Sequence, residues 1–140
     1  MAEALLRHDG GEAFEAASAG SHPAGFIHQL AVEAMQSMGV SMEGQSSKGW
    51  HEFAGDEFDA VITLCDAAAQ EACPAWPGDP VTAHWSLPDP AYHSGTDEER
   101  IAFALRVAER LRVKIAGLLQ VDFDAGPDAV KSRLDFLGEI

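Results

Sequence analysis

Two short apolar runs near the middle of the chain have the pattern of buried β-strands. The first, Ala60 to Leu64, is rich in β-branched residues and carries no charge, which is typical of a strand covered on both faces. The second runs from Val81 to Trp85. A third run, Phe14 to Ser18, consists mainly of small residues and is also predicted to be a short strand. The pattern therefore predicts at least three short strands separated by longer segments.

The longer segments repeat apolar residues at helical spacing. Predicted helices cover residues 1–7, 27–38, 96–120 and 128–137. Gly39 stands where a left-handed residue commonly ends a helix. Thr96-Asp97-Glu98-Glu99 has the form of a capping box and opens the longest helix. Helices alternating with short apolar strands indicate an α/β fold with a parallel sheet and helices on both faces, and residues 1–140 are expected to form one domain.

The charge balance narrows the range of partners. The chain has 9 Lys and Arg residues against 23 Asp and Glu residues, giving a net charge of 9 − 23 = −14. Such a surface repels nucleic acid and anionic membranes. No apolar run is long enough to span a bilayer, and Met1 to Leu6 is too short and too acidic for a secretory signal. We therefore expect a cytoplasmic protein that binds neither nucleic acid nor membrane.

Two cysteines are the first candidates for chemistry. Cys65 follows the strand at 60–64 and precedes a run of helix formers, so its thiol is expected at a helix N-terminus, where the pKa of a thiol falls. Cys73 closes that run, and Pro74 prevents its continuation. In the cytosol a cysteine pair is more often redox-active or metal-binding than structural. On position alone, a reactive role for Cys65 and a role as a small buried apolar residue are about equally supported.

Asp89 is the third candidate. It stands between Pro88 and Pro90 at the end of the strand at 81–85 and could act as a general acid, although Asp-Pro is also a common turn pair. His84 and His93 could join the cysteines in a zinc site, but no pair has finger-like spacing, so no metal is expected. His84 is interpreted as a core histidine. Ser47-Lys48 is interpreted as a solvated loop.

Several of these segments together resemble one family. The segments CDAAAQEACPAWPG (65–78), TAHW (82–85) and DPA (89–91), with SAGSHPAG (18–25) upstream and Ser47-Lys48 to Trp50 between them, are similar to arsenate reductases built on the low-molecular-weight protein tyrosine phosphatase fold. The resemblance covers nearly the whole chain. It implies a three-layer α/β sandwich whose four parallel strands lie in the order 2-1-3-4.

The resemblance also implies roles for the candidates. Cys65 would be a relay thiol that attacks an oxidised partner cysteine and then exchanges with Cys73, while Asp89 would protonate the departing oxygen of an arsenate or phosphate-like oxyanion. No cofactor would be bound, and an external thiol, thioredoxin or glutathione with glutaredoxin, would reduce the pair. The cysteines are 73 − 65 = 8 positions apart, about 12 Å if helical, whereas a disulfide needs about 7 Å or less, so the segment would have to unwind.

One part of the family pattern is missing. The family's nucleophile lies in a Cys-x-x-x-x-x-Arg loop before a helix similar to MAEALL, the sequence of residues 1–6 here. The chain is therefore expected to be N-terminally truncated, without the first, central strand and the catalytic loop, and inactive alone. Each buried backbone group left without a partner costs about 1–3 kcal/mol, so the sheet is expected to be unstable, rearranged or completed by a strand from a second copy.

Three functions remain open on the sequence. The first is thiol-dependent reduction of arsenate to arsenite in the complete protein, as part of arsenic detoxification. The second is a low-molecular-weight protein tyrosine phosphatase, which would use Asp89 but would not need Cys65 and Cys73. The third is a non-catalytic thiol-sensing module that forms a homodimer by strand exchange.

Overall fold

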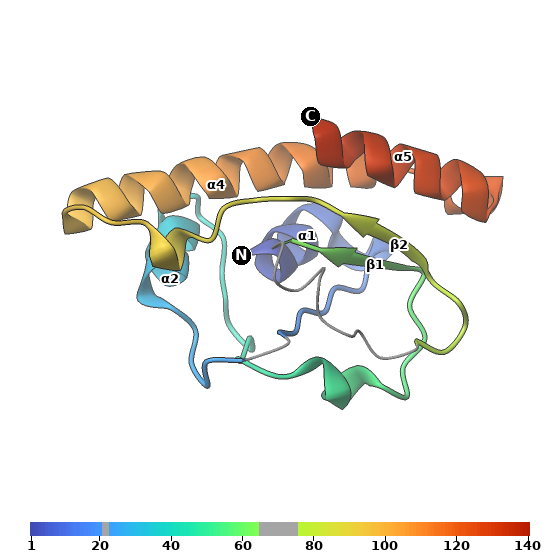
Figure 1. The fold of residues 1–140 in the computed structure, drawn as a ribbon, viewed down its shortest axis with the longest axis horizontal. Coiled ribbons are helices and arrows are strands. Elements are labelled where there is room, and N and C mark those ends of the chain that lie inside the picture. The colour runs from blue at the N-terminus through green and yellow to red at the C-terminus, as the bar shows by residue number, and fades with distance from the viewer. Residues whose placement is uncertain (21–22, 65–75) are drawn as a thin grey trace.

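The computed structural model describes residues 1–20, 23–64 and 76–140 (Figure 1). In these residues four α-helices and two β-strands follow one another with short 3₁₀ turns between them. The helices and strands are α1 (Ala2–Gly10), α2 (Gln29–Ser37), β1 (Ala60–Thr63), β2 (Val81–His84), α4 (Asp97–Leu118) and α5 (Pro127–Glu139). The 3₁₀ turns are η1 (Gly11–Ala13), η2 (Trp50–Phe53), η3 (Pro90–Tyr92) and η4 (Phe123–Ala125).

The two strands pair in parallel, as the sequence predicted. Their register runs from Ala60 opposite Val81 to Thr63 opposite His84. Backbone bonding continues past the strand ends, because Trp85 N–H donates to the Thr63 carbonyl at 2.8 Å and Leu87 N–H donates to the Leu64 carbonyl at 2.9 Å. Strands β1 and β2 correspond to the third and fourth strands of the expected order, and they are neighbours, as that order requires.

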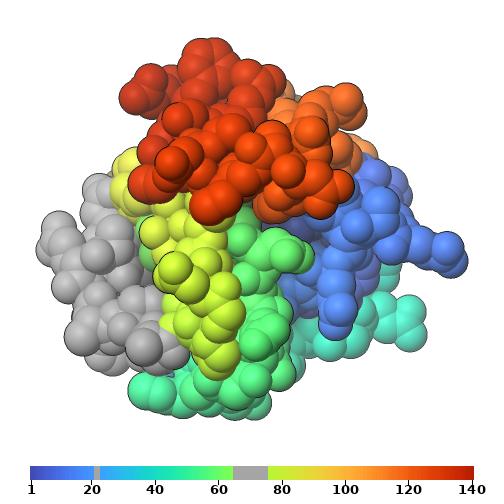
Figure 2. All heavy atoms as spheres, turned by 90° about the vertical axis from the view of Figure 1, so that its right-hand side faces the viewer, coloured from blue at the N-terminus to red at the C-terminus, as the bar shows by residue number. Residues whose placement is uncertain are grey.

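One face of β2, continued by the residues that follow it, is buried in the core. Ala83, Trp85 and Leu87 are buried, and the residues between them are exposed, which is the alternation of a half-buried strand. The Trp85 indole N–H donates to the Leu134 carbonyl of α5 at 2.8 Å. Gly138 allows α5 to approach, since a Cβ there would lie 2.9 Å from the His84 carbonyl oxygen. Figure 2 shows α5 above the residues around β2.

The longest helix, α4, joins the other helices into a single core. Helices α1 and α2 both pack against α4, and α5 packs against β2 and the C-terminal half of α4, where Gly117 leaves room for Leu137 (Figure 1). The N-cap half of the expected capping box is present at the start of α4: Glu99 N–H donates to the Thr96 hydroxyl, and that hydroxyl donates to Glu99 Oε1, both at 3.2 Å. The buried apolar residues of α4 are Ala104, Val107, Ala108, Leu111, Ile115 and Leu118.

The strand predicted at Phe14–Ser18 is not formed. These residues have no regular secondary structure, and the pairing nearby is an isolated bridge between Gly20 and Gly49. A strand is defined by its ladder, and among the described residues no neighbouring strand offers one to this segment. All four residues of β1 are only half-buried, although the pattern of 60–64 is that of a strand covered on both faces. The described sheet thus has two strands, whereas three of the family's four strands were expected in this chain.

No helix in the described part of the chain has the combination of length and apolar character that crossing a membrane requires.

Candidate functional site

At the carboxyl edge of the two parallel strands, the residue before Cys65 is bonded to the chain that leads to Asp89. Leu64 directly follows β1 and precedes Cys65, and Leu87, whose N–H donates to the Leu64 carbonyl at 2.9 Å, stands two residues before Asp89. Residues 65–75, and with them Cys65 and Cys73, lie outside the described residues. The chain nevertheless enters the cysteine segment and the Asp89 turn from adjacent points on one sheet edge.

Asp89 is held in a defined turn. Its Oδ1 accepts from Ala91 N–H at 2.9 Å and so caps η3, and Asp89 itself is exposed. Two contacts fix the following residues on α4: Arg100 Nη2 donates to the Ala91 carbonyl at 3.4 Å, and the His93 ring stacks on Phe103 with centroids 3.9 Å apart. The carboxylate is therefore accessible at a fixed position, and the capping role expected of a turn aspartate is also present.

His84 does not lie in the core. It is exposed at the end of β2, and its Nδ1 lies 2.7 Å from the Thr63 hydroxyl across the strand pair. The interpretation of His84 as a core histidine is wrong because the two faces of β2 differ: Ala83 and Trp85 point into the core, and the alternate residues do not. His84 and Thr63 instead place a polar pair at the same sheet edge as the Asp89 turn.

A buried carboxylate in α1, Glu3, is a feature that the sequence reasoning missed. Glu3 is only 5% exposed, and four polar side chains donate hydrogen bonds to it. The donors are Arg7 at 2.8 Å, Ser18 at 2.9 Å, Gln45 at 3.1 Å and Lys48 at 3.4 Å. Burial raises the pKa of Glu3, but the bond from Ser18 and the charges of Lys48 and Arg7 outweigh it, so the pKa is lowered overall.

The contacts of Lys48 correct the expectation of a solvated loop at Ser47-Lys48. The Lys48 side chain is only 17% exposed and ties its loop to α1 through Glu3. The spacing of Glu3 and Arg7, four residues apart on one helix, is a signal that the sequence does carry. The contacts of Glu3 with Ser18, Gln45 and Lys48 join segments far apart in the sequence, and no local pattern predicts them.

A second ion pair fixes the end of α1 to α4. Arg112 Nε and Nη2 donate to the two carboxylate oxygens of Asp9 at 2.8 and 2.7 Å. The hydrogen bonds from Arg112 lower the pKa of Asp9 and outweigh the opposing effect of burial.

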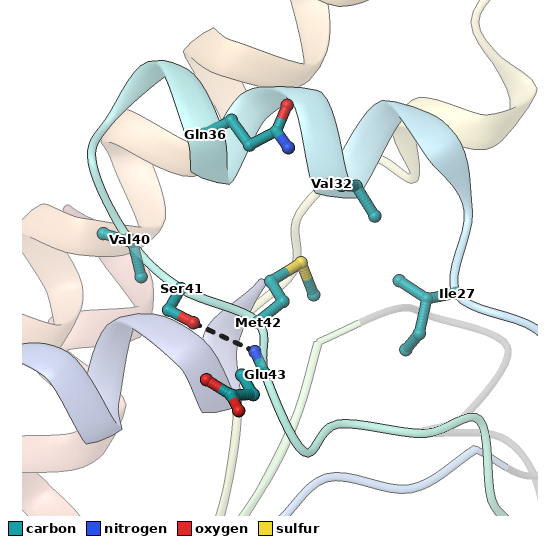
Figure 3. Close-up of a pocket in the computed structure, with 7 residues that line it drawn as sticks. All are labelled: Ile27, Val32, Gln36, Val40, Ser41, Met42 and Glu43. Atoms are coloured by element: carbon teal, nitrogen blue, oxygen red, sulfur yellow. Dashed lines mark hydrogen bonds between the residues drawn. The ribbon is translucent and has the colours of Figure 1, made fainter.

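Two hollows in the described surface are lined by residues other than Asp89. The larger one, of about 420 Å³, is an open groove between α2 and residues 40–43 (Figure 3). Its lining residues are Ile27, Val32, Gln36, Val40, Ser41, Met42 and Glu43. The Ser41 hydroxyl accepts from Glu43 N–H at 3.1 Å and shapes the loop on one side. Its lining carries one acidic and no basic side chain, so it offers an oxyanion no positive charge.

Among residues 1–20, 23–64 and 76–140, no group of three or more His, Cys, Asp or Glu side chains is arranged to hold a metal ion.

Comparison with known proteins identifies the family. Residues 1–123 match the low molecular weight phosphotyrosine protein phosphatase family, and the chain belongs to that family. The match spans both strands, the Asp89 turn and α4. The expected fold class, a parallel sheet with helices in the manner of this family, is confirmed.

Several relatives are named arsenate reductases. The chain is 35% identical over 115 residues to the one from Halalkalibacterium halodurans, covering 82% of this chain and 81% of that protein. It is 34% identical over 111 residues to the one from Bacillus subtilis, covering 79% and 78%. A glutaredoxin arsenate reductase from Synechocystis is 31% identical over 64 residues, covering 46% and 48%. A solved structure described as an arsenate reductase in reduced state superimposes with a TM-score of 0.61 and 26% identity, covering 84% of this chain and 86% of that one. The predicted resemblance is confirmed.

Proposed function

We propose that this chain takes part in the thiol-dependent reduction of arsenate to arsenite, with Cys65 and Cys73 as a relay pair and Asp89 as general acid. Relatives named arsenate reductases, about 35% identical over about four-fifths of both chains, support this reaction over others in the family. The observation that supports the site is the bond from Leu87 N–H to the Leu64 carbonyl, which joins the residue before Cys65 to the strand that leads to Asp89.

The electron balance defines what each thiol does. Reduction of arsenic(V) to arsenic(III) takes two electrons, which two thiols supply by becoming a disulfide. A nucleophilic thiolate first binds arsenic, and Asp89 protonates the oxygen that leaves as water. Cys65 attacks the sulfur of that thiolate, and the sulfur–arsenic electron pair departs with arsenite. Cys73 then attacks the Cys65 sulfur of the mixed disulfide and expels the first thiolate, leaving a Cys65–Cys73 disulfide.

The first nucleophile is not one of these two cysteines. Neither Cys65 nor Cys73 is followed six residues later by arginine, since Glu71 and Asp79 stand there. The proposed mechanism therefore needs a third thiol, and we expect the 140 residues to reduce arsenate negligibly when supplied alone. The disulfide is reduced by an external thiol, thioredoxin or glutathione with glutaredoxin, and the name of the Synechocystis relative supports the second source.

The test uses purified protein expressed from its complete reading frame. Arsenate-dependent NADPH oxidation is followed with thioredoxin and thioredoxin reductase, and separately with glutathione, glutaredoxin and glutathione reductase. Cys65→Ser and Cys73→Ser should each abolish multiple turnover with both reductants. Full turnover in either variant would contradict the relay.

Asp89 has a matched control. Asp89→Asn keeps the cap of η3, because asparagine caps as well as aspartate, but it removes the acid and should lower turnover about 10²- to 10⁴-fold. Asp122 caps η4 in the same manner, accepting from Asp124 N–H at 3.0 Å. Asp122→Asn should therefore leave turnover unchanged. Equal effects of the two substitutions would show that Asp89 only caps its turn.

The second candidate is hydrolysis of phosphorylated tyrosine, which the description of the family favours. It uses the same fold and Asp89, but it does not need the cysteine pair. Hydrolysis of an aryl phosphate that survives Cys65→Ser while arsenate reduction is lost supports the reductase. Efficient aryl-phosphate turnover without any arsenate reduction supports the phosphatase.

The third candidate is a thiol-sensing module that dimerises through the sheet. The half-burial of β1, which pairs with β2 alone among the described residues, favours it. Light scattering on the purified 140-residue chain distinguishes the states: a stable dimer supports strand exchange, and a monomer counts against it.

A further inference from the structure

Strand β2 has an outer edge, on the side away from β1, that no described strand pairs with. The N–H groups of Val81 and Trp85 donate to carbonyls on the β1 side, at 3.1 and 2.8 Å. In a parallel pair the backbone groups of alternate residues face the same neighbour, so those of Thr82 and His84 face the outer edge. The expected strand order places β2 at the end of the sheet as well.

Helix α5 covers this outer edge. Figure 1 shows α5 alongside β2 on the side opposite β1. Lys131 Nζ donates to the Thr82 carbonyl at 2.9 Å. The His84 carbonyl lies so close to the helix that a Cβ at Gly138 would stand 2.9 Å from its oxygen. Both outward-facing carbonyls within β2 are therefore covered by α5.

Contacts with β2 and α4 hold the helix in this place. The Trp85 indole N–H donates to the Leu134 carbonyl at 2.8 Å. The buried ammonium of Lys114, on α4, donates to three carbonyls at the end of α5 at 2.8 to 3.0 Å. The last carbonyls of a helix lack partners within it, so Lys114 completes their hydrogen bonding. The apolar residues that α5 buries are Val130, Leu134 and Leu137.

The helix lies outside the part of the chain that the family model matches. The match ends at residue 123, whereas α5 begins at Pro127. Both strands lie within the match, so the edge belongs to the family domain and its cover does not. An open strand edge carries unpaired N–H and C=O groups, which a strand of another chain can pair with, and a covering helix prevents such pairing.

We propose that α5 is an edge cover, which keeps the outer edge of β2 from pairing with the same edge of a second copy of this chain. Two copies related by a two-fold axis would bring their β2 strands together antiparallel, with Thr82 and His84 supplying donors and acceptors on both sides. This surface is separate from the β1 side, through which the third candidate function would form its dimer. The inference does not depend on arsenate reduction.

The test loosens the cover at its two contacts with the edge while keeping the apolar residues of α5. Lys131→Ala removes the bond to the Thr82 carbonyl, and Gly138→Val places side-chain atoms against the His84 carbonyl. Molecular mass is measured by size-exclusion chromatography with light scattering over a range of concentrations, in reducing buffer, so that cysteine oxidation cannot link chains. The parent is expected to stay a monomer, and the double variant should dimerise with a dissociation constant at least about tenfold lower.

Thr82→Pro distinguishes edge pairing from association through exposed apolar surface. Proline has no N–H, and the Thr82 N–H faces away from β1, so this substitution removes a donor of the outer edge but none of the ladder between β1 and β2. Added to the double variant, it should return the protein to a monomer. Arg133→Ala with Phe136→Ala changes two residues on the exposed side of the same helix and, as the matched control, should leave the mass of the parent unchanged.

A monomeric double variant, or a dimer that Thr82→Pro does not dissociate, overturns the proposal. A parent that dimerises as tightly as the double variant overturns it too, because α5 would then not hinder pairing. Circular dichroism confirms that each variant is folded. If Gly138→Val prevents folding, Gly138→Ala takes its place, since its single added carbon already meets the His84 oxygen.

Discussion

At the scale of single residues, the charged side chains depart furthest from what a sequence pattern predicts. Residues 1–7 have the composition of a helix with Leu5 and Leu6 facing the core, yet the structure buries Glu3 with Ala4 and Leu5. Glu3 is stable there because four donors surround its carboxylate and offset the cost of removing it from water. Burial of a charge depends on partners, and three of the four partners of Glu3 come from distant segments.

Replacing Glu3 tests this balance through pH. The lowered pKa of Glu3 means that its contribution to stability is present above the ordinary glutamate value of 4.5 and is lost as pH falls through the lower pKa of the folded protein. Glu3→Gln should lower the free energy of unfolding by about 1–3 kcal/mol at pH 7, because two positive charges lose their partner. Urea denaturation at a series of pH values should show the difference in unfolding free energy between variant and parent narrowing as the pH falls below 4.5.

The control for this prediction is Glu52→Gln. Glu52 is an exposed glutamate in η2 whose side chain has no hydrogen bond to any of the described residues. The Glu52→Gln substitution should shift the unfolding free energy by less than about 0.5 kcal/mol at every pH. A gap for Glu3→Gln that stayed constant from pH 7 to pH 3 would mean that the loss came from packing rather than from charge.

At the scale of elements, the hydrophobic periodicity of the sequence predicted most helices and the two central strands correctly. Helices α2, α4 and α5 lie within about two residues of their predicted bounds, and the two central strands appear where the apolar runs stand. The strand prediction for Phe14–Ser18 failed because a strand needs a pairing partner, and a five-residue sequence does not show whether one is available. Of the site, Asp89 could be placed at the end of its strand, whereas Arg100 and His93, which hold its turn, could not.

The contact between α1 and α4 is testable as an element-scale interaction. The pair of Asp9 and Arg112 joins residues 103 positions apart through two hydrogen bonds. A double-mutant cycle with Asp9→Asn and Arg112→Gln, measured by urea denaturation, should give a coupling energy of about 0.5–1 kcal/mol, the upper part of the range for partly exposed pairs.

The exposed pair of Lys131 and Asp135 on α5 is the comparison for this cycle. These residues lie four positions apart with a separation of 3.4 Å, and both side chains are about half exposed. Their coupling should not exceed about 0.5 kcal/mol. If both cycles gave the same small coupling energy, the bidentate hydrogen bonding of Arg112 to Asp9 would add nothing to the packing of α1 on α4.

At the scale of the whole molecule, the excess of negative charge acts against the compact state. The net charge is −14, and several of the nine basic side chains are already committed to internal contacts. Raising sodium chloride from about 20 to about 300 mM shortens the screening length and should raise the urea midpoint at pH 7.

The variant Glu12→Gln, Glu15→Gln, Asp56→Asn removes three exposed acidic groups and serves as the comparison. It should be more stable than the parent in low salt and respond less to added salt. A parent chain whose midpoint does not change with salt would show that repulsion among the exposed carboxylates has no measurable effect on stability.

The burial of Lys114 has a practical consequence. Its ammonium is fully covered and donates to the Leu137 and Gly138 carbonyls at 3.0 Å each, near the end of α5. The chain has two other lysines: Lys131 is 53% exposed and Lys48 17% exposed. An amine-reactive reagent should therefore modify Lys131 first, Lys48 more slowly and Lys114 last. The rate of modification at Lys114 would report how often α5 detaches from α4. A footprinting experiment could therefore follow the opening of the C-terminal helix at this single lysine.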